Sequence, residues 1–250
     1  MTRARQLKWA AQVDHVREAT LAGTADAGAW SAYFESIAPG VSPVAQDGRC
    51  PVMIVAAEAR FYGVQFREVS ISVSVSSQSL RAGQLGETWF LAQAWSSVRA
   101  FAWVERTMFS TPYEHALISL DPLQPVKITL ASATGAELRA TMAPQTSTAR
   151  SAKSDADEEW LGYLLVPNRV GASAQRQQAF IARLRGRTQR FAFDPQQDEL
   201  RISAGTSTWA RSPFADCDFV ADEWVIRGDG FHAKSRTYRL TEIEQMTVSP

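Results

Sequence analysis

Apolar and polar residues alternate most regularly between residues 65 and 76. From residue 69 to residue 75 every odd position is valine or isoleucine, whereas the even positions are Glu68, Ser70, Ser72 and Ser74. A period of two predicts a strand with one face in the core. The serine face allows two interpretations. It is an exposed face of the sheet, or its small hydroxyl groups line a ligand cavity with Glu68 at the rim.

The same period continues along much of the chain and predicts a β-rich protein. Residues 86–95 are apolar on both faces, which places them in the centre of a sheet. Residues 143–158 hold small, polar and charged residues with one proline, and are predicted to form a flexible excursion. Residues 174–187 fit either a helix or a strand. Further strands are expected at 52–60, 115–120, 126–130, 136–142, 191–193, 199–203, 207–211, 223–227 and 231–240, with a hairpin turn at residues 229 and 230.

Three segments fit the helical period instead. Residues 4–22 carry a modest apolar stripe, and residues 27–37 are followed by a proline and a glycine. Residues 98–108 are apolar on several sides, which predicts a buried helix. We therefore expect an α+β, β-rich fold, with an antiparallel barrel-like sheet, one buried central helix and N-terminal helices. Residues 1–50 are expected to form a helical segment packed on a main domain at 51–250.

The charge balance and the scarcity of metal ligands narrow the possible functions. The 250 residues include 26 basic and 26 acidic side chains, so no basic excess favours binding to nucleic acid. Two isolated cysteines and three histidines form no zinc pattern, and we expect no metal or cofactor. The first residues do not resemble a signal peptide, and no apolar run is long enough to span a bilayer. A cytoplasmic protein without membrane partners is expected.

Two short motifs carry the candidate chemistry. Residues 66–68 read Phe-Arg-Glu and lie on the serine-rich strand. Further along, Arg106 is followed after five residues by Pro112 and Tyr113, which places Tyr113 45 residues beyond Glu68. In this spacing the chain resembles the acetoacetate decarboxylase-like superfamily. That superfamily has an aromatic residue two positions before a glutamate, and later an Arg-Glu-x-x-Gly-x-Pro-Lys segment.

The resemblance extends over about residues 52–240 and implies the family's fold, but not the reaction for which the family is named. The family's lysine forms an imine with the substrate, and here its position is held by Tyr113. The next position, often a second lysine, is Glu114, while Thr107 and Ser110 replace a glutamate and a glycine. Because a phenol cannot form an imine, Schiff-base decarboxylation is not expected.

A lysine from elsewhere could take over the lost role, and Lys127 and Lys234 are the candidates. The second of these lies on a predicted strand where His232, Lys234, Arg236 and Tyr238 alternate on one face. That face is either solvated or forms a wall that faces an anion. The sequence leaves both alternatives open.

On the implied fold, three residues converge on a pocket and form the candidate catalytic group. Arg106 would clamp a carboxylate or enolate. Tyr113 would donate a hydrogen bond to a carbonyl oxygen or an oxyanion. Glu68, desolvated by its neighbours, would have a raised pKa and act as acid or base. The alternative is a structural ion pair between Glu68 and Arg106, with Tyr113 filling the turn.

Two functions follow from these alternatives. The first is a non-decarboxylating enzyme of lyase or isomerase type that converts a small carbonyl or carboxylate compound by enolisation, aldol or hydration chemistry. The second is a non-catalytic ligand-binding or scaffold protein that retains the fold. In both, the partner is a small molecule, and a homo-oligomer is possible. Four residues near the motifs are expected to contact the ligand: Ser70, Ser72, Pro112 and His115.

Overall fold

The computed structural model describes residues 5–77, 87–123, 125–144, 152–167, 177–203, 213–243 and 246–247. Its helices are α1 (Ala27–Ile37), α2 (Arg99–Met108) and α3 (Leu240–Ile243), with a 3-10 turn at Pro213–Ala215. Its strands are β1 (Arg5–Gln6), β2 (Trp9–Asp26), β3 (Val41–Pro43), β4 (Arg49–Phe61), β5 (Val64–Ser77), β6 (Thr88–Ser96), β7 (Tyr113–Asp121), β8 (Lys127–Ser132), β9 (Glu137–Thr141), β10 (Ser154–Val166), β11 (Gln178–Ala192), β12 (Glu199–Ser203), β13 (Val220–Ser235), β14 (Tyr238–Arg239) and β15 (Met246–Thr247). The predicted β-rich α+β fold is confirmed.

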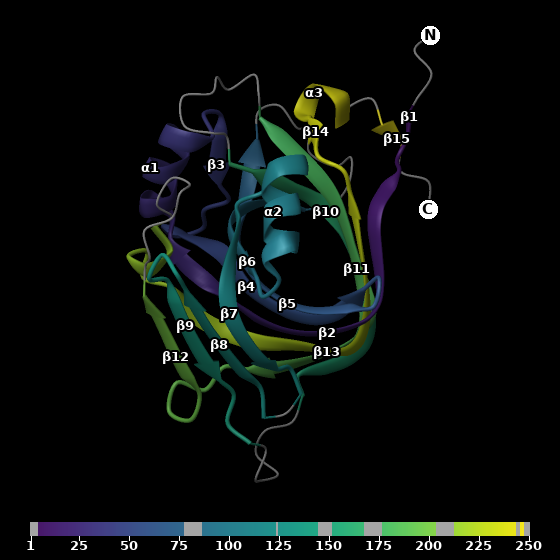
Figure 1. Ribbon diagram of the computed structural model, residues 1–250. Coiled ribbons are helices and arrows are strands. Elements are labelled where there is room, and N and C mark those ends of the chain that lie inside the picture. Colours follow the sequence, from purple (N-terminus) through teal and green to yellow (C-terminus); the bar gives the residue numbers. More distant parts are fainter. Residues whose placement is uncertain are drawn as a thin grey trace.

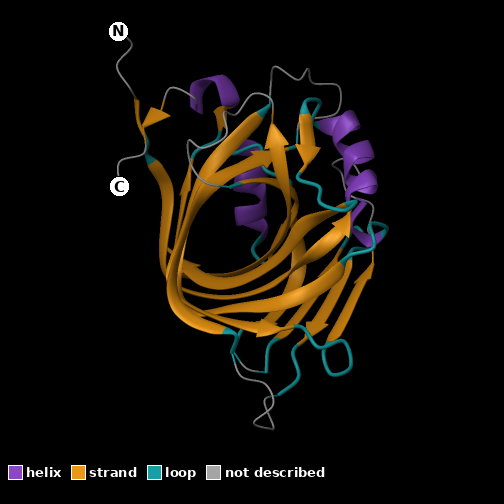
Figure 2. Cartoon of the chain, turned by 180° about the vertical axis from the view of Figure 1, so that it is seen from behind, coloured by secondary structure: helices purple, strands orange, loops and turns teal. Residues whose placement is uncertain are grey.

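The main sheet closes into a ring of hydrogen-bonded strands. The order is β6-β10-β11-β13-β2-β4-β5, and β5 pairs again with β6. One edge of β6 is divided: residues 88–90 pair with 163–165 of β10, and residues 94–96 pair with 113–115 of β7. From β7 the sheet leaves the ring through β8 and β9 to β12, and Figures 1 and 2 show this extension beside the ring.

The prediction of an antiparallel sheet is wrong at the divided edge of β6, where both pairings are parallel. Between β6 and β7 the chain passes through α2, and such a crossover connection returns it in the same direction. The other pairings of the ring are antiparallel.

The helix predicted over residues 4–22 is wrong, because this segment forms most of β2. The strand lies inside the ring's order, with β13 on one edge and β4 on the other. Two neighbours satisfy its backbone groups on both sides, and this outweighs a weak helical stripe. Its alternate residues Ala19, Leu21 and Ala25 are fully buried in the main core, in keeping with a period of two.

The helix predicted over residues 27–37 is confirmed as α1. Asp26 caps it by accepting a hydrogen bond from the backbone N–H of Ala29 at 2.7 Å. Trp30 and Phe34 are fully buried, and the ring of Phe34 lies 4.8 Å from that of Phe90 on β6. Side-chain packing against β6 therefore holds α1 to the sheet.

Helix α2 lies in the opening of the ring, as Figures 1 and 2 show. The prediction that it is buried all round is wrong, because Ala102 is its one buried residue and Trp103 is 55% exposed. Ala102 packs in a small apolar cluster with side chains from β6, β7, β10 and β11. We call the face of the ring strands that meets this cluster the α2 side. The other members of the cluster are Leu91, Ala94, Tyr113, Val166, Phe180 and Ala182.

Two loop predictions are also wrong. The flexible excursion predicted at 143–158 is a strand from Ser154 onward, because β10 pairs with β11 along its whole length. The strand interpretation of residues 174–187 is thereby confirmed for the described part, β11. The hairpin expected at residues 229 and 230 is a bulge inside the single strand β13. The strand predicted at 207–211 lies outside the described residues. Among the described helices, none is long and apolar enough to cross a membrane.

Candidate functional site

The serine-rich face of β5 turns toward the α2 side. Val69, Ile71 and Val73 lie in the main core, so the alternating residues face the other way. Of these, Glu68 accepts a hydrogen bond from the Tyr113 hydroxyl, with 3.2 Å between Oη and Oε2. Tyr113 belongs to the apolar cluster around α2. The two residues linked by the motif spacing therefore meet in space.

A lysine and a second glutamate complete this group. Lys234, near the end of β13, forms an ion pair through Nζ with Oε2 of Glu105 on α2. Thr111 is fully buried and donates a hydrogen bond from Oγ1 to the same oxygen at 2.7 Å. The Lys234 and Glu105 side chains are 19% and 18% exposed, so water and small solutes can reach them. We call Glu68, Glu105, Tyr113 and Lys234 the Glu68 cluster.

Aromatic rings surround the Lys234 ammonium. Nζ lies 4.4 Å from the ring centroid of Phe180, 5.0 Å from that of Phe109 and 5.7 Å from that of Tyr113. Such contacts attract a cation to the negative ring face. Lys234 therefore stands beside Tyr113, whereas Lys127 is exposed on β8.

The two carboxyl groups of the cluster share one lysine, and this changes the pKa of Glu68. Burial and the negative charge of Glu105 raise that pKa from 4.5 to about 7, although Lys234 and the hydrogen bond from Tyr113 act in the opposite direction. Burial, with the charges of Glu68 and Glu105, also raises the pKa of Tyr113 well above its ordinary value. At neutral pH the cluster therefore holds a neutral phenol and a carboxyl group near its midpoint of ionisation.

Other residues predicted for the site are placed differently. Arg106 is partly exposed in the last turn of α2, and no contact joins it to Glu68 or Tyr113 in the part of the chain that the structure describes. Its neighbour Glu105 faces the cluster, and successive side chains on a helix point about 100° apart. His115, on β7, is partly buried.

Three smaller residues lie close to the motif residues. Ser70 and Ser72 share the α2 side of β5 with Glu68, and Ser72 is only 3% exposed. Pro112 is buried directly before Tyr113, and its carbonyl oxygen accepts a hydrogen bond from Ala94 N. Their role as ligand contacts stays a prediction.

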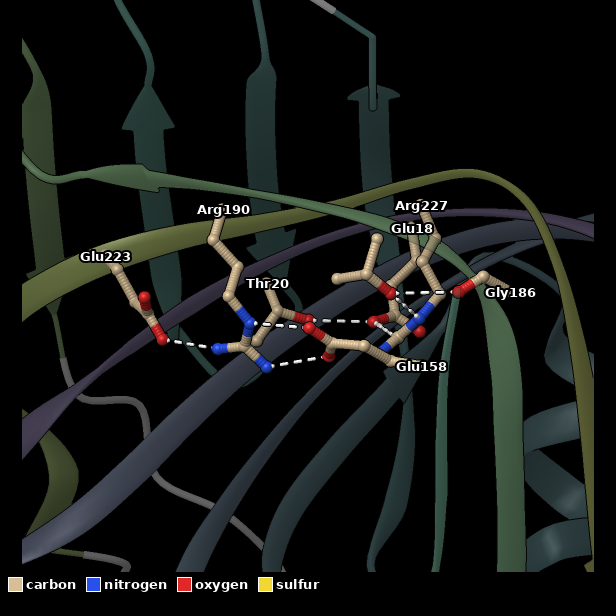
Figure 3. Close-up of polar contacts among 8 residues, drawn as sticks. Glu18, Thr20, Glu158, Gly186, Arg190, Glu223 and Arg227 are labelled. Carbon is tan, nitrogen blue, oxygen red and sulfur yellow. Dashed lines mark hydrogen bonds and ion pairs between the residues drawn. The ribbon is translucent and has the colours of Figure 1, made fainter. Parts of the chain in front are cut away.

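A second polar group lies on the α2 side, and we call Glu18, Arg227 and His232 the Glu18 cluster. Oε1 of Glu18 accepts a bond from NH1 of Arg227 at 2.5 Å, and Oε2 lies 2.8 Å from Nε2 of His232. Burial acts to raise the Glu18 pKa, but the contact with His232 and the charge of Arg227 outweigh it and bring it to about 2. Figure 3 shows the contact between Glu18 and Arg227.

The Glu18 cluster continues into a network across β10, β11 and β13. Arg227 also donates from Nε to Thr188 Oγ1 at 2.9 Å. Beyond it, Arg190 binds both oxygens of Glu158, at 3.0 and 2.9 Å, and one oxygen of Glu223 at 2.6 Å (Figure 3). These guanidinium groups are thus engaged by protein carboxylates.

Strand register places the two clusters side by side. Ala57 on β4 stands directly opposite Glu18 on β2 and directly opposite Glu68 on β5. Directly opposed residues share one face of a sheet. Two strand spacings amount to about 10 Å, so the two carboxylates are near neighbours across the ring.

A groove of about 700 Å³ lies apart from the Glu68 cluster. It is lined by residues 9–15 and 17 of β2 and by the β4–β5 hairpin, including Phe61 and Tyr62, and none of the four Glu68-cluster residues lines it. The groove exists because β2 pairs with β4 only from Arg17 onward, so the first half of β2 diverges from the hairpin. No group of histidine, cysteine or acidic residues suited to a metal ion occurs among the described residues.

Glu105 is not among the predicted site residues, and the sequence names Lys234 only as one of two lysines that could take over the lost role. The alternation of His232 and Lys234 on one strand face was the available signal, and it left an anion-facing wall as one alternative. The structure shows that this wall faces Glu18 and Glu105.

No protein-family model and no curated protein sequence matches the chain. Solved structures do match. The enduracididine biosynthesis enzyme MppR, in complex with the condensation product of pyruvate and imidazole 4-carboxaldehyde, has a TM-score of 0.58 and 12% identity, covering 96% of this chain and 93% of its own. Acetoacetate decarboxylase from Legionella pneumophila has a TM-score of 0.57 and 13% identity, covering 95% and 92%. A further acetoacetate decarboxylase structure has a TM-score of 0.56 and 11% identity, covering 91% and 88%. The chain therefore has the acetoacetate decarboxylase-like fold that the motif resemblance implies.

Proposed function

We propose that the protein binds a small carbonyl or carboxylate compound at the Glu68 cluster and converts it by acid–base chemistry without an imine. The observation that carries this proposal is the hydrogen bond from Tyr113 to Glu68 beside the ion pair of Lys234 and Glu105. A carboxyl group with a pKa of about 7, a phenol and an ammonium group then lie close together.

The simplest reaction for these groups is enolisation. The Glu68 carboxylate removes a proton from the carbon next to the carbonyl group, and the C–H electron pair forms the C=C bond while the carbonyl becomes an enolate. The Lys234 ammonium stabilises the negative oxygen. Return of the proton from Glu68 to carbon completes a cycle, and a pKa near the working pH suits both directions.

Lys234 takes the role of the cation that the sequence assigned to Arg106. Its ammonium group is held by Glu105, and an amine must lose a proton before it can attack a carbonyl carbon. The geometry therefore favours electrostatic stabilisation by Lys234 over imine formation. Arg106, which has no partner among the described residues, remains a candidate for a more distant carboxylate of the ligand.

The similar structures support the substrate class. The MppR structure holds a condensation product of pyruvate, a 2-keto acid, and the other two proteins are named for acetoacetate, a 3-keto acid. Small keto acids are therefore the first compounds to test with this chain.

Deuterium exchange tests the proposal directly. The wild-type protein is incubated with pyruvate or acetoacetate in D2O, and loss of the C–H signal is followed by proton NMR. We expect exchange that falls at least about 100-fold in Glu68→Gln. Glu137→Gln, at an exposed position of β9, is the matched control and should behave as wild type. Exchange that is equal in wild type and Glu68→Gln contradicts the proposed role.

Borohydride treatment in the presence of acetoacetate tests the absence of an imine. We expect no covalent adduct by mass spectrometry in wild type or in Lys127→Met. An adduct that disappears in Lys234→Met would show that Lys234 is a nucleophile and would overturn that part of the proposal. Thermal stabilisation by keto acids without any exchange would instead favour the ligand-binding alternative.

A further inference from the structure

His232 lies on the same side of β13 as Lys234, two residues before it. Their direct partners on β11 are Leu184 and Ala182, and both pack with the apolar cluster around α2. Two residues along a strand span about 7 Å. His232 therefore lies next to Lys234 of the Glu68 cluster, on the same face of the sheet.

Glu18 fixes the imidazole ring of His232. Nε2 of His232 lies 2.8 Å from Oε2 of Glu18, whose side chain is only 3% exposed. The other oxygen of Glu18 is held by Arg227 and accepts a bond from Thr20 Oγ1 at 3.1 Å, so the carboxylate cannot turn away. A carboxylate on one ring nitrogen orients the ring and leaves the other nitrogen for chemistry.

The remaining ring nitrogen, Nδ1, has no partner within the described parts of the chain. The His232 side chain is 25% exposed, so a small molecule can approach it. Glu18 from β2 contacts the ring, and Arg227 from β13 contacts that carboxylate. Lys234, two residues further along β13, is paired with Glu105 of α2.

The donors of the Glu68 cluster leave one requirement of enolisation unmet. Tyr113 has a single O–H, and it is directed at Glu68. Lys234 supplies a positive charge, but its ammonium group is already engaged by Glu105. A group that gives its proton to the carbonyl oxygen while Glu68 removes one from carbon should titrate near neutral pH, as an imidazole does.

We propose that His232 is a second proton-transfer residue of the site and that Glu18 is its positioning residue. The inference rests on the proposed function and adds the general acid to it. In the forward step the C–H bond breaks and its proton goes to Glu68. The Nδ1–H bond of the His232 imidazolium breaks and its proton goes to the carbonyl oxygen, which leaves a neutral enol, a protonated Glu68 and a neutral imidazole. The reverse transfers restore the ketone.

Exchange of the pyruvate methyl protons in D2O, measured from pH 5 to pH 9, tests this assignment. We expect His232→Asn and His232→Gln to lower kcat for exchange by about 100-fold with KM changed less than threefold. Glu18→Gln should lower kcat less than the His232 variants do, with KM changed less than threefold, because the imidazole loses the carboxylate that positions it and the substrate contacts remain. The control His15→Asn, at an exposed surface pair with Asp229, should match wild type.

The outcomes separate this inference from the proposed function. Exchange that depends on Glu68 but is unchanged in both His232 variants overturns the role of His232 alone. No exchange in the wild-type protein at any pH overturns both. Thermal unfolding of every variant shows whether a loss reflects a misfolded protein, and His232→Gln retains a donor for Glu18 if His232→Asn does not fold. If neither variant folds, an exchange rate of the wild type that follows the ionisation of Glu68 alone overturns the inference.

Discussion

The Glu18 and Glu68 clusters place the same kind of side chain on the same face of the ring, yet their carboxyl groups behave in opposite ways. Glu18 has a pKa of about 2 and Glu68 a pKa of about 7, although burial acts on both to raise it. Glu18 touches a guanidinium and an imidazole, whereas Glu68 touches a phenol and lies near a second carboxylate. Direct contact with a cation decides the ionisation of a buried carboxyl group here.

The difference in pKa also separates a carboxyl group that supports the fold from one that can exchange a proton. A carboxylate saturated by cations is held rigidly and stays ionised, so it supports the fold and orients a neighbour. A carboxyl group near its midpoint of ionisation is poised to exchange a proton. The ring carries both kinds, and Glu18 and Glu68 are separated by Ala57 alone in the cross-strand row.

Glu18→Gln should have the largest effect on stability. It leaves the buried Arg227 guanidinium without its charged partner, and we expect a loss of about 3–5 kcal/mol in the free energy of unfolding at pH 7, measured with urea. Because the Glu18 pKa is lowered from 4.5 to about 2, the stabilisation is present above pH 4.5 and is lost as the pH falls toward 2. The control Glu159→Gln removes a more exposed pair with Arg183 and should cost about 0–1 kcal/mol. Equal losses of unfolding free energy in Glu18→Gln and Glu159→Gln would show that the buried contacts of Glu18 contribute no more than an exposed ion pair.

Glu68→Gln should raise the free energy of unfolding at high pH, whereas Glu18→Gln lowers it. Glu68 has a pKa raised from 4.5 to about 7, so the wild type is fully stable below pH 4.5 and loses stability as the pH rises through 7. The variant avoids that loss, and at pH 8 we expect it to be more stable than wild type by on the order of 2 kcal/mol, with no difference at pH 4. Urea unfolding at both pH values is the measurement. A variant that is less stable at pH 8 would show that the ionised Glu68 is well satisfied.

Tyr113→Phe should have a smaller effect, about 1 kcal/mol, from one lost hydrogen bond. The bond lowers the Glu68 pKa, so its loss should raise that pKa and move the pH midpoint of the stability curve upward. Tyr62→Phe, at a position that is 92% exposed, is the control and should change neither quantity. An unchanged midpoint in Tyr113→Phe would show that the hydrogen bond does not influence Glu68.

Arg106→Ala should have the smallest effect. With no partner for Arg106 among the described residues, we expect a change within about 0.5 kcal/mol in unfolding free energy. Thermal stabilisation by pyruvate should fall less than in Lys234→Met, because Lys234 is the cation beside Tyr113. A larger loss of pyruvate binding in Arg106→Ala would restore the clamp role that the sequence suggests.

The local patterns of the sequence predict the parts of the fold that depend on neighbours in the chain. The alternation along β5 and the proline and glycine that follow α1 are of this kind. The segment that forms β2 carries too weak a pattern, and only its two partner strands, far away in sequence, make it a strand. Similarly, β13 continues through the glycines at 228 and 230 because β11 and β2 pair on both sides of the bulge.

The candidate site shows the same limit. The motif spacing links Glu68 with Tyr113, and the structure brings them together. Lys234 and Glu105 are 129 residues apart, and their pairing depends on where α2 sits in the ring. No spacing rule predicts such a contact. Arg106 was favoured over Glu105 because the family motif contains the arginine, whereas the direction of each side chain depends on how the helix is rotated.

The divided edge of β6 has a consequence for how the ring holds together. Three residue pairs join β6 to β10, whereas ten join β4 to β5. The ring is therefore closed by a short strand pairing, and local opening should begin there, since fewer backbone hydrogen bonds must break. Amide hydrogens in the β6–β10 pairing should exchange with solvent sooner than those between β4 and β5. The side chains around Lys234 would then be held together only while β6 and β10 stay paired.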